Sequence, residues 1–479
     1  MLSTSLNPQN VFKFFEQLAA IPHGSGNMCK IAQFCENFAK EHALKCVRDN
    51  ANNVIIYKNG TAGYENSEPV ILQGHLDMVC QKALDCNIDF ETEGLQLCVD
   101  GDFLKANGTT LGADNGIAVA MILAILESDD VSHPPIEAVF TTDEETGMNG
   151  ALALDATLLK GKRMINLDEE KEGQVTVSCA GGSDFVVDIP LATKKQNGLI
   201  FTVDIKGLKG GHSGIEIHKN RVNANMLAGR FLNELKQTCN FDIISINGGD
   251  KANAIPNRCV IELCVKDDTA FCSDASKILA DIKAEISDRE GDFVFEIENR
   301  NAQECFVFEK EIKDKLIYTL LCAPNGVVEM SADIDGLVQT SLNLGILATN
   351  KQNLVLHFAL RSSKMSAIAF LQKRLCAFFD MLGLSYNTFG HYPAWEYREN
   401  SPLRDVFIAC HKECFGIEPK TSAIHAGLEC GVFASKISDF DCIAIGPTMH
   451  DVHTTRERLS ISSTNNIYNL LLEILKNLK

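Results

Sequence analysis

Near-continuous apolar runs alternate with helical stretches along the first third of the chain. Residues 70–73 and 136–141 are rich in β-branched and other apolar side chains, which predicts two buried strands. Residues 117–125, between them, form an apolar run that indicates a buried helix. Buried strands separated by helices are typical of a mostly parallel sheet. We therefore expect an α/β domain that begins with residues 1–185.

The pattern changes after residue 186. A strand at 199–205 is followed by a helix near 225–235, two further strands, a second helix and a strand near 293–297. This β-α-β-β-α-β order is that of a ferredoxin-like unit. The sequence therefore predicts an α+β region at this point of the chain.

The elements after residue 311 partly repeat the same order, and residues 260–266 are echoed by residues 355–361. The repeat predicts two ferredoxin-like units within one inserted α+β domain, residues 186–391. The α/β pattern then returns, so residues 392–479 are expected to complete the first domain.

Composition narrows the class of protein. The net charge of −19 and pI of about 5.1 argue against nucleic acid or an anionic membrane surface as a partner. No run reaches the roughly 18 apolar residues of a membrane span, and the N-terminus lacks the features of a secretory signal. The 18 cysteines are scattered without a Cys-x-x-Cys pair, which favours small buried hydrophobes in a reducing compartment. We expect a cytoplasmic protein.

Five segments place imidazole or carboxylate side chains just past a strand or at a helix N-terminus. They are His75 with Asp77, Asp114, residues 143–145, Asp168, and His450 with His453. In open α/β sheets, ligands bind at the edge where the parallel strands end. Solvated loop carboxylates would explain any one segment, but hardly five at one topological position. The pattern predicts a metal site at this edge.

Several longer runs extend this picture beyond the sheet edge. They are residues 74–79 (Gly-His-Leu-Asp-Met-Val), 108–116, 144–145, 207–214, 253–256 and 425–431. With these runs the chain resembles the co-catalytic dinuclear zinc peptidases, the family that includes carnosinases and aminoacylases, over essentially its whole length. The resemblance implies a zinc-peptidase catalytic domain with an inserted lid domain. It also implies hydrolysis of Xaa-His and other unblocked dipeptides in the cytosol.

The resemblance also implies a ligand set for two Zn²⁺ ions, with Co²⁺ or Mn²⁺ as substitutes. Asp114 would bridge the two ions. His75 and Asp168 would complete the first site, and Glu145 and His453 the second, with an open position for water.

Two further carboxylates have implied catalytic roles. Asp77 would orient His75, and Glu144 would act as the general base that takes a proton from the water. The family carries its last ligand in a Gly-Pro-His-Ser-Pro loop, from which residues 449–457 depart. His453 keeps the spacing to the residues that follow, and His450 is the alternative.

Substrate-binding residues are implied in both domains. In the inserted domain, His212, Asn253 and Arg361 match the family's substrate-gripping positions. By themselves, a histidine in a Gly-rich turn and an arginine at a strand end would be interpreted as solvated side chains. Gly427 and Glu429 lie in a loop of the catalytic domain and are expected to meet the α-amino end of the dipeptide.

Two other functions fit parts of this pattern. One is an N-acyl amino acid deacylase of the same family, and the other is a peptide-binding relative without turnover. The presence of Glu144 argues against the second, and the doubled inserted domain argues against the first. In single-lid relatives, a partner's lid supplies the oxyanion histidine. The doubling here predicts a site complete within one chain, and leaves open whether the protein is a homodimer.

Overall fold

The computed structural model describes residues 2–479, which form two compact units. The first unit comprises the chain up to Cys179 together with Tyr397–Ala423 and Leu428–Lys479. The second comprises Ala180–Glu396 together with Ile424–Gly427. The chain therefore passes between the units at residues 180 and 397, where the sequence pattern had placed the boundaries at 186 and 392.

The short segment Ile424–Gly427 belongs to the second unit, although Gly427 was expected in a loop of the catalytic domain. The backbone N–H of Ala180 donates to the carbonyl oxygens of both Ile424, at 3.1 Å, and Ala426, at 3.0 Å. These long-range hydrogen bonds join the segment to the start of the second unit, and nothing in the local sequence indicates them.

The first unit is built on an eight-stranded sheet in the order β1-β2-β6-β3-β7-β21-β8-β20. Its strands are β1 (Lys45–Arg48), β2 (Val54–Lys58), β3 (Val70–His75), β6 (Ile136–Thr141), β7 (Arg163–Asn166), β8 (Gln174–Cys179), β20 (Lys420–Ile424) and β21 (Asp441–Ala444). A four-stranded sheet contains β4 (Leu97–Asp100), β5 (Phe103–Ala106), β22 (Met449–His450) and β23 (Arg458–Ser460).

The predicted α/β class is confirmed, and the large sheet combines parallel and antiparallel pairs. Strands β6, β3, β7 and β21 pair in parallel. Strand β2 runs antiparallel to both β1 and β6, and β8 runs antiparallel to β21. A short turn joins β1 to β2, and the N–H of Asp49 donates to the carbonyl of Asn53 across it. So short a connection can join only antiparallel neighbours.

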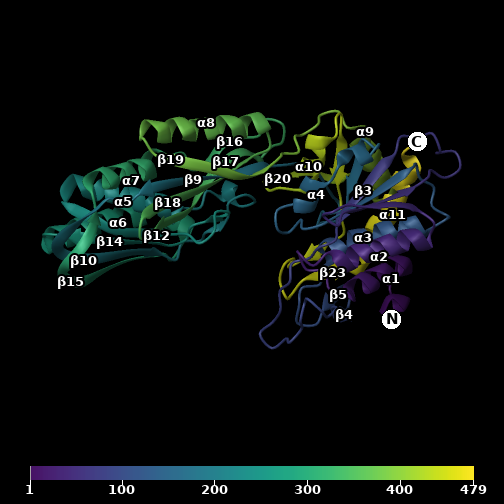
Figure 1. Ribbon diagram of the computed structural model, residues 1–479, viewed down its shortest axis with the longest axis horizontal. Coiled ribbons are helices and arrows are strands. Elements are labelled where there is room, and N and C mark those ends of the chain that lie inside the picture. The colour runs from purple at the N-terminus through teal and green to yellow at the C-terminus, as the bar shows by residue number, and fades with distance from the viewer. Residues whose placement is uncertain (1) are drawn as a thin grey trace. The chain divides into compact units, whose positions relative to one another are not determined.

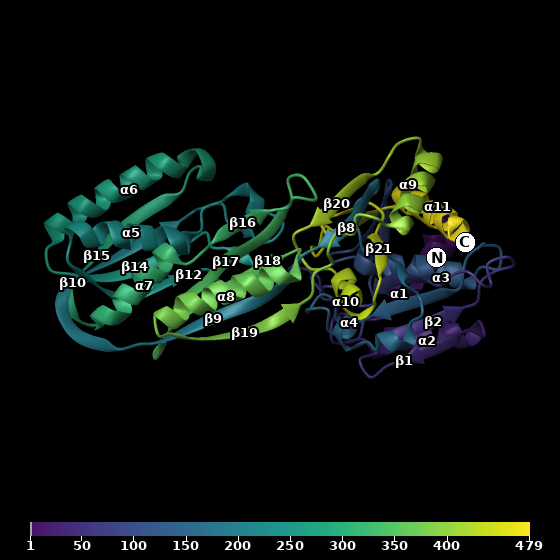
Figure 2. The same ribbon diagram turned by 90° about the horizontal axis from the view of Figure 1, so that it is seen from above.

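Helices of the first unit pack on this sheet. They are α1 (Gln9–Ala19), α2 (Cys29–Glu41), α3 (Ala113–Glu127), α4 (Asn149–Ala153), α9 (Pro402–Phe415), α10 (Glu429–Lys436) and α11 (Ile461–Asn477), with 3-10 turns η1 (Leu2–Ser5) and η2 (Ala156–Leu158). Helix α3 lies between α1 and β3 (Figures 1 and 2), and its side chains from Asn115 to Leu126 are buried. A helix that is apolar on all sides needs such a fully enclosed place.

The second unit is a nine-stranded antiparallel sheet in the order β15-β10-β14-β12-β17-β18-β9-β19, with β16 also on β17. Its strands are β9 (Gly181–Pro190), β10 (Thr193–Lys206), β12 (Phe241–Gly248), β14 (Cys259–Val265), β15 (Val294–Phe308), β16 (Gly326–Met330), β17 (Val338–Thr349), β18 (Asn353–Ser362) and β19 (Ser385–Tyr392). Its helices are α5 (Ala224–Thr238), α6 (Asp268–Glu290), α7 (Lys310–Cys322) and α8 (Met365–Met381), with η3 (Ile217–Lys219); β11 (Gly211–His212) and β13 (Ala254–Ile255) form a separate ladder.

Two ferredoxin-like units make up this sheet, and one is nested within the other. The first runs β10-α5-β12-β14-α6-β15 and has the strand order β15-β10-β14-β12. The second has the equivalent strand order β19-β9-β18-β17. Its first strand, β9, therefore precedes all elements of the first ferredoxin-like unit, β10 to β15, in sequence. The two halves meet where β12 pairs with β17. The echoed sequence runs lie on β14 and β18, the equivalent third strands.

One apolar cluster joins helices α5, α6, α7 and α8 to this sheet. The ribbons of these helices lie on one face of the sheet (Figures 1 and 2). Strand β18 reflects the arrangement because buried residues alternate with half-buried ones along its length. Such alternation is expected for an antiparallel sheet that is covered on one face.

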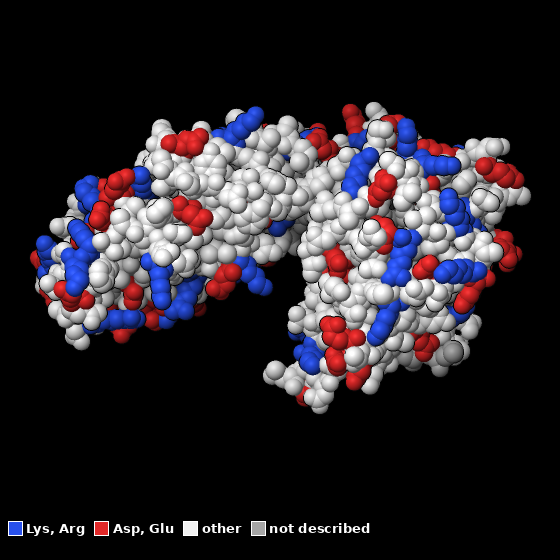
Figure 3. All heavy atoms as spheres, viewed as in Figure 1, with Lys and Arg blue, Asp and Glu red and all other residues white. Residues whose placement is uncertain are grey.

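Acidic and basic side chains are interspersed over the visible face of the molecule (Figure 3). Within residues 2–479, none of the helices combines the length and the apolar character that crossing a bilayer requires. The cysteines only partly match the expectation of burial. Seven are buried, but Cys29, Cys272, Cys322 and Cys414 are exposed.

Candidate metal centre and substrate-binding residues

The start of α3 packs against the end of β3, and this contact needs a glycine. A Cβ atom at Gly74 would lie 2.6 Å from Asn115 Oδ1 and 2.8 Å from the Cβ of Ala118. Asn115 uses the space by accepting from the N–H of His75 at 3.3 Å and donating to the carbonyl of Leu167 at 2.9 Å. One side chain thus ties together β3, α3 and the residue that follows β7.

Two imidazoles lie beside Asp114, each at a different carboxylate oxygen. His75 Nε2 lies 3.1 Å from Asp114 Oδ1, and His453 Nε2 lies 3.0 Å from Asp114 Oδ2. His75 Nε2 is also 3.5 Å from Asp168 Oδ1, and His453 Nε2 is 2.8 Å from Glu145 Oε1. Each oxygen of Asp114 therefore belongs to a separate set of three donors, whose ligand atoms lie within 4.8 Å of one another.

The residues present fit divalent metal ions. Imidazole nitrogens and carboxylate oxygens are donors that zinc takes, and one carboxylate shared between two sets is a natural bridge. The cluster also holds more carboxylates than imidazoles, since Glu144 lies close to His75 and Glu145 in a third group. Partly buried negative charges close to one another are unfavourable without a matching cation, so a cation would stabilise this arrangement.

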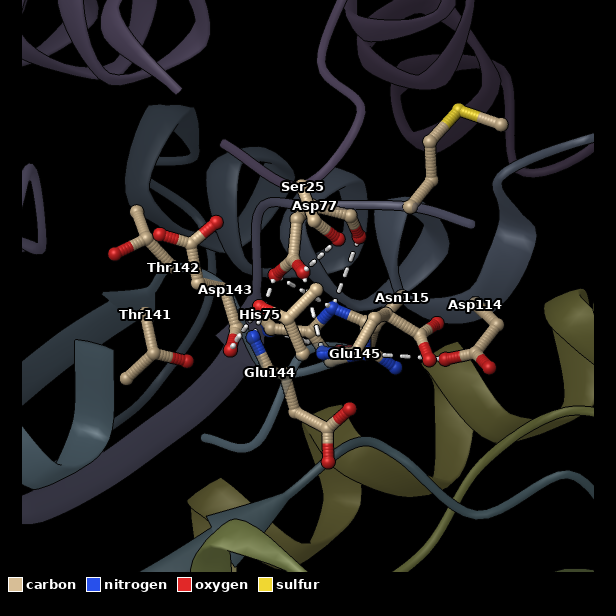
Figure 4. A network of polar contacts seen from close by, with 12 residues as sticks. Ser25, His75, Asp77, Asp114, Asn115, Thr141, Thr142, Asp143, Glu144 and Glu145 are labelled. Atoms are coloured by element: carbon tan, nitrogen blue, oxygen red, sulfur yellow. Dashed lines mark hydrogen bonds and ion pairs between the residues drawn. The ribbon is translucent and has the colours of Figure 1, made fainter. Parts of the chain in front are cut away.

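The carboxylate of Asp77 organises the surroundings of His75. His75 Nδ1 lies 3.0 Å from the Asp77 carbonyl oxygen and 3.5 Å from its Oδ1. Asp77 also accepts from the N–H groups of Glu144, at 3.0 Å, and Glu145, at 3.2 Å, and from the hydroxyl of Ser25, at 2.8 Å (Figure 4). Burial alone would raise the pKa of Asp77, but its pairing with His75 and the hydrogen bonds from the Glu144 N–H and the Ser25 hydroxyl hold that pKa below its usual value.

The Glu144 carboxyl group points away from Asp77, although its own N–H faces Asp77 (Figure 4). Burial raises the pKa of Glu144 well above its usual value, and the nearby carboxylates of Asp168 and Glu429 raise it further, against the opposing charge of His75. A carboxylate with a raised pKa is a better proton acceptor. Asp143, the adjacent carboxylate, instead accepts from the N–H of Gly26 at 2.6 Å.

The pKa values of two carboxyl groups in the cluster, Asp168 and Asp114, are shifted in opposite directions. Burial raises the pKa of Asp168 to about 7, aided by the charges of Asp114 and Glu145. Hydrogen bonds from His453 and His75 outweigh burial at Asp114 and lower the pKa of that carboxyl group. The same pairing with Asp114 and Glu145 raises the pKa of His453 to about 11.

Of the two histidines in the C-terminal loop, His453 is the one beside Asp114 and Glu145. His450 lies on β22, where its ring is exposed and contacts the ring of Phe103 at a centroid distance of 5.8 Å. The geometry therefore places His453 within the donor cluster and His450 outside it. The ligand role of His453 stays a prediction.

In the second unit, the β11–β13 ladder brings His212 and Asn253 together. His212 pairs with Ala254, and the N–H of Ser213 donates to the carbonyl of Asn253 at 2.9 Å. His212 Nδ1 accepts from the N–H groups of Gly214 and Ile215, both at 3.1 Å. Burial and the charge of Arg361 lower the pKa of His212. A neutral ring whose Nδ1 accepts must carry its proton on Nε2.

Arg361 lies near the end of β18 and lines a cavity of about 270 Å³ within the second unit. Its Nη1 donates to the hydroxyl of Tyr392 at 2.8 Å, while its Nε is buried without a hydrogen-bond partner among the described residues. Asn253 and Asp184 also line this cavity. A buried, unpaired N–H on a guanidinium group is a vacant position for an acceptor.

Glu429 begins α10 and is fully buried in the first unit, beneath the ends of β3 and β6. Its Oε2 accepts from Gln73 at 2.5 Å and from Thr141 at 2.6 Å, and its Oε1 has no hydrogen-bond partner among the described residues. Burial raises the pKa of Glu429 to about 7. Its expected contact with a substrate ammonium group stays a prediction.

Sequence reasoning missed the buried amides that connect these groups. Gln73 accepts from Asn166 Nδ2 at 2.6 Å, and the Asn166 side chain in turn accepts from the N–H of Asp168 at 3.2 Å. The one local signal is a polar side chain at the end of each apolar strand, just before a proposed ligand. That signal does not distinguish a buried amide network from a solvated strand end.

Comparison with known proteins is consistent with this geometry. The model of the peptidase family M20/M25/M40 matches residues 71–477, and the chain belongs to this family. Among its relatives, the cytosol non-specific dipeptidase of Escherichia coli (strain K12) is 36% identical over 480 residues, which cover 99% of this chain and 98% of that protein.

Solved structures agree with this assignment. The aminoacylhistidine dipeptidase of Vibrio alginolyticus superimposes with a TM-score of 0.92 and 34% identity, covering 99% of this chain and 98% of that chain. Aminopeptidase PepT of Bacillus cereus, at 14% identity and a TM-score of 0.53, covers 99% of both chains and shares the fold. The predicted family is thus confirmed.

A pH-dependent stability is expected from His425 in the second unit. Burial, together with the charges of Arg361 and His212, lowers the pKa of His425 to about 3. The unfolded chain takes up this proton near pH 6.5 and the folded chain does not, so stability is full above pH 6.5 and falls as the pH drops toward 3. The free energy of unfolding of the metal-free protein should decrease by at most about 1.4 kcal/mol per pH unit from this group.

Denaturant unfolding between pH 7.5 and 5 of the wild-type protein and of His425→Gln measures this contribution. Glutamine retains a polar group toward Ser341 Oγ, which lies 2.7 Å from His425 Nε2. The variant should lose stability less steeply with falling pH than the wild type. Parallel pH profiles for the two proteins would contradict the assignment.

Proposed function

We propose that this chain is a metal-dependent dipeptidase that hydrolyses Xaa-His and other unblocked dipeptides. The observation that carries the proposal is Asp114, whose two carboxylate oxygens each face a different imidazole and a further carboxylate. This arrangement supports a bridged pair of ions. The names of the E. coli and Vibrio relatives support dipeptides as the substrate class, and the former supports a cytoplasmic location.

Two Zn²⁺ ions are proposed, with Co²⁺ or Mn²⁺ as substitutes. His75 and Asp168 would hold one ion, Glu145 and His453 the other, and Asp114 both. When bound, the ions polarise the peptide carbonyl group and lower the pKa of the attacking water. The excess of carboxylates over imidazoles in this partly buried cluster supports the loading of divalent cations.

Glu144 is proposed as the general base. The Glu144 backbone N–H donates to the Asp77 carboxylate, and the Glu144 carboxyl group points away from Asp77 (Figure 4). Glu144 would accept a proton from the attacking water and deliver it to the nitrogen of the leaving amine as the peptide bond breaks. The raised pKa of Glu144 supports this role because it makes the carboxylate a better proton acceptor.

Residues of the second unit are proposed to bind the dipeptide. His212 would donate from Nε2–H to the oxygen that becomes negative in the transition state. Arg361 would bind the terminal carboxylate, which its unpaired Nε supports, with Asn253 lining the same cavity. Gly427 and Glu429 would meet the α-amino end of the substrate.

A substrate panel tests the function. The metal-free protein reloaded with Zn²⁺ should hydrolyse Xaa-His and other free dipeptides. It should cleave N-acetyl amino acids much more slowly, since they lack the free α-amino group that the proposed contacts recognise, and tripeptides complete the panel. Amino-acid release is followed by chromatography. Preferential cleavage of N-acetyl amino acids would favour the deacylase, and no cleavage of any substrate would favour the peptide-binding relative.

The substitution Glu144→Gln should leave two zinc ions bound while lowering kcat by at least ~10²-fold, the usual size of a general-base effect. Glutamine keeps the shape of the side chain but does not accept the proton. Elemental analysis gives the metal content, and steady-state kinetics give kcat. Asp143→Asn, one position earlier, is the matched control and should behave like the wild type. Normal turnover in Glu144→Gln would rule out the role.

We also infer that one chain supplies the complete set of catalytic and substrate-binding residues. Mixing His212→Ala chains with Glu144→Gln chains should therefore restore no activity. Differently tagged chains, denatured and refolded together, show by co-purification whether mixed oligomers form. Recovery of activity toward about one quarter of the wild-type level, the most that random pairing into dimers allows, would show that subunits share their sites.

A further inference from the structure

The carboxyl group of Glu457 is buried and lies against the N-terminus of α3. Glu457 Oε2 accepts from the backbone N–H of Leu111 at 2.8 Å and of Gly112 at 3.3 Å. Its Oε1 accepts from Ala113 at 2.9 Å and from Asp114 at 3.5 Å. Only 3% of Glu457 is exposed. The first N–H groups of a helix lack partners within it, and here one side chain supplies them.

The segment that ends in Glu457 also carries His453. Its turns are closed by the N–H of Glu457, which donates to the carbonyl of Thr454 at 3.1 Å, and by the hydroxyl of Thr454, which donates to the carbonyl of Asp451 at 2.7 Å. Directly after Glu457, β23 pairs with β5. His453 and Glu457 are thus two contacts made by one short, internally bonded loop on the start of α3.

We propose that Glu457 is a positioning residue that sets the Asp114 carboxylate and the His453 imidazole relative to each other. Its hydrogen bonds fix the backbone that bears Asp114, and its own chain segment fixes His453. The loop contacts the start of α3 through His453 and through Glu457. The contact through His453 uses its Nε2 and an Asp114 oxygen, the atoms that a metal would take. Glu457 holds the loop through atoms that no metal needs, so it can order the donors before loading.

This inference rests on the proposed dinuclear site, and the first unit contains a matched control for it. Glu137 in β6 is also a buried carboxyl group, 4% exposed, that accepts from backbone N–H groups. It accepts from Lys160 at 2.9 and 3.0 Å and from Gly161 at 3.0 Å. Glu137 lies near the start of β6, whereas the proposed ligand Glu145 lies beyond its end.

The experiment compares Zn²⁺ binding by the wild-type protein, Glu457→Gln and Glu137→Gln. In either variant one carboxyl oxygen becomes an NH₂ group that opposes the backbone donors, so both should unfold at a lower temperature. Competition with a chelating dye should show zinc binding weakened ~10–100-fold in Glu457→Gln, as is usual when a group supporting metal ligands is lost. Glu137→Gln should bind zinc like the wild type.

Wild-type zinc affinity in Glu457→Gln, or an equal loss in Glu137→Gln, would overturn the inference. Should Glu457→Gln fail to fold, Glu457→Asp keeps both oxygens on a shorter arm and should show a smaller loss of zinc affinity. Unchanged affinity in Glu457→Asp would then overturn it. A wild-type protein that binds no zinc would instead refute the proposed function, so the two failures are distinguishable.

Discussion

The close packing of α3 on β3 is the contact on which the rest of the candidate site depends. Gly74 has no side chain, so the start of α3 approaches the strand closely enough for Asn115 to reach the His75 backbone. This approach places Asp114 between two imidazoles and gives each of its oxygens a different neighbour. A side chain at residue 74 would push the helix away and separate the two sets of donors.

The charges of the clustered side chains also shift one another's pKa values. Burial raises the pKa of Asp168 to about 7, whereas pairing with the two imidazoles lowers that of Asp114. Neighbouring carboxylates in this partly buried cluster repel one another when charged, and bound cations would compensate that charge. Backbone donors and buried amides hold these groups in place, so a cation finds its donors already oriented and little reorganisation is needed on loading.

The second unit shows how long-range pairing outweighs local sequence preference. The first strand of its second ferredoxin-like unit is β9, which begins with Gly181 and Gly182. By composition, these two glycines indicate a loop and not a strand. Here β9 pairs with both β18 and β19. A Cβ at Gly181 would lie 2.5 Å from the backbone nitrogen of Ala394, so the glycines permit a close approach by the returning chain. Strand propensity cannot reveal such a partner, which lies about two hundred residues away.

The sequence by itself determined the apolar strands, the buried helix between them and the imidazole and carboxylate groups at their ends, because these follow from local periodicity and spacing. It did not determine which groups would meet. The tertiary structure brought His453 rather than His450 to Asp114, enclosed Glu429 beneath the sheet edge, and placed Glu457 against the N–H of Leu111, 346 positions earlier in the chain. Such contacts depend on how strands and loops far apart in sequence are stacked, and no local pattern of residues carries that information.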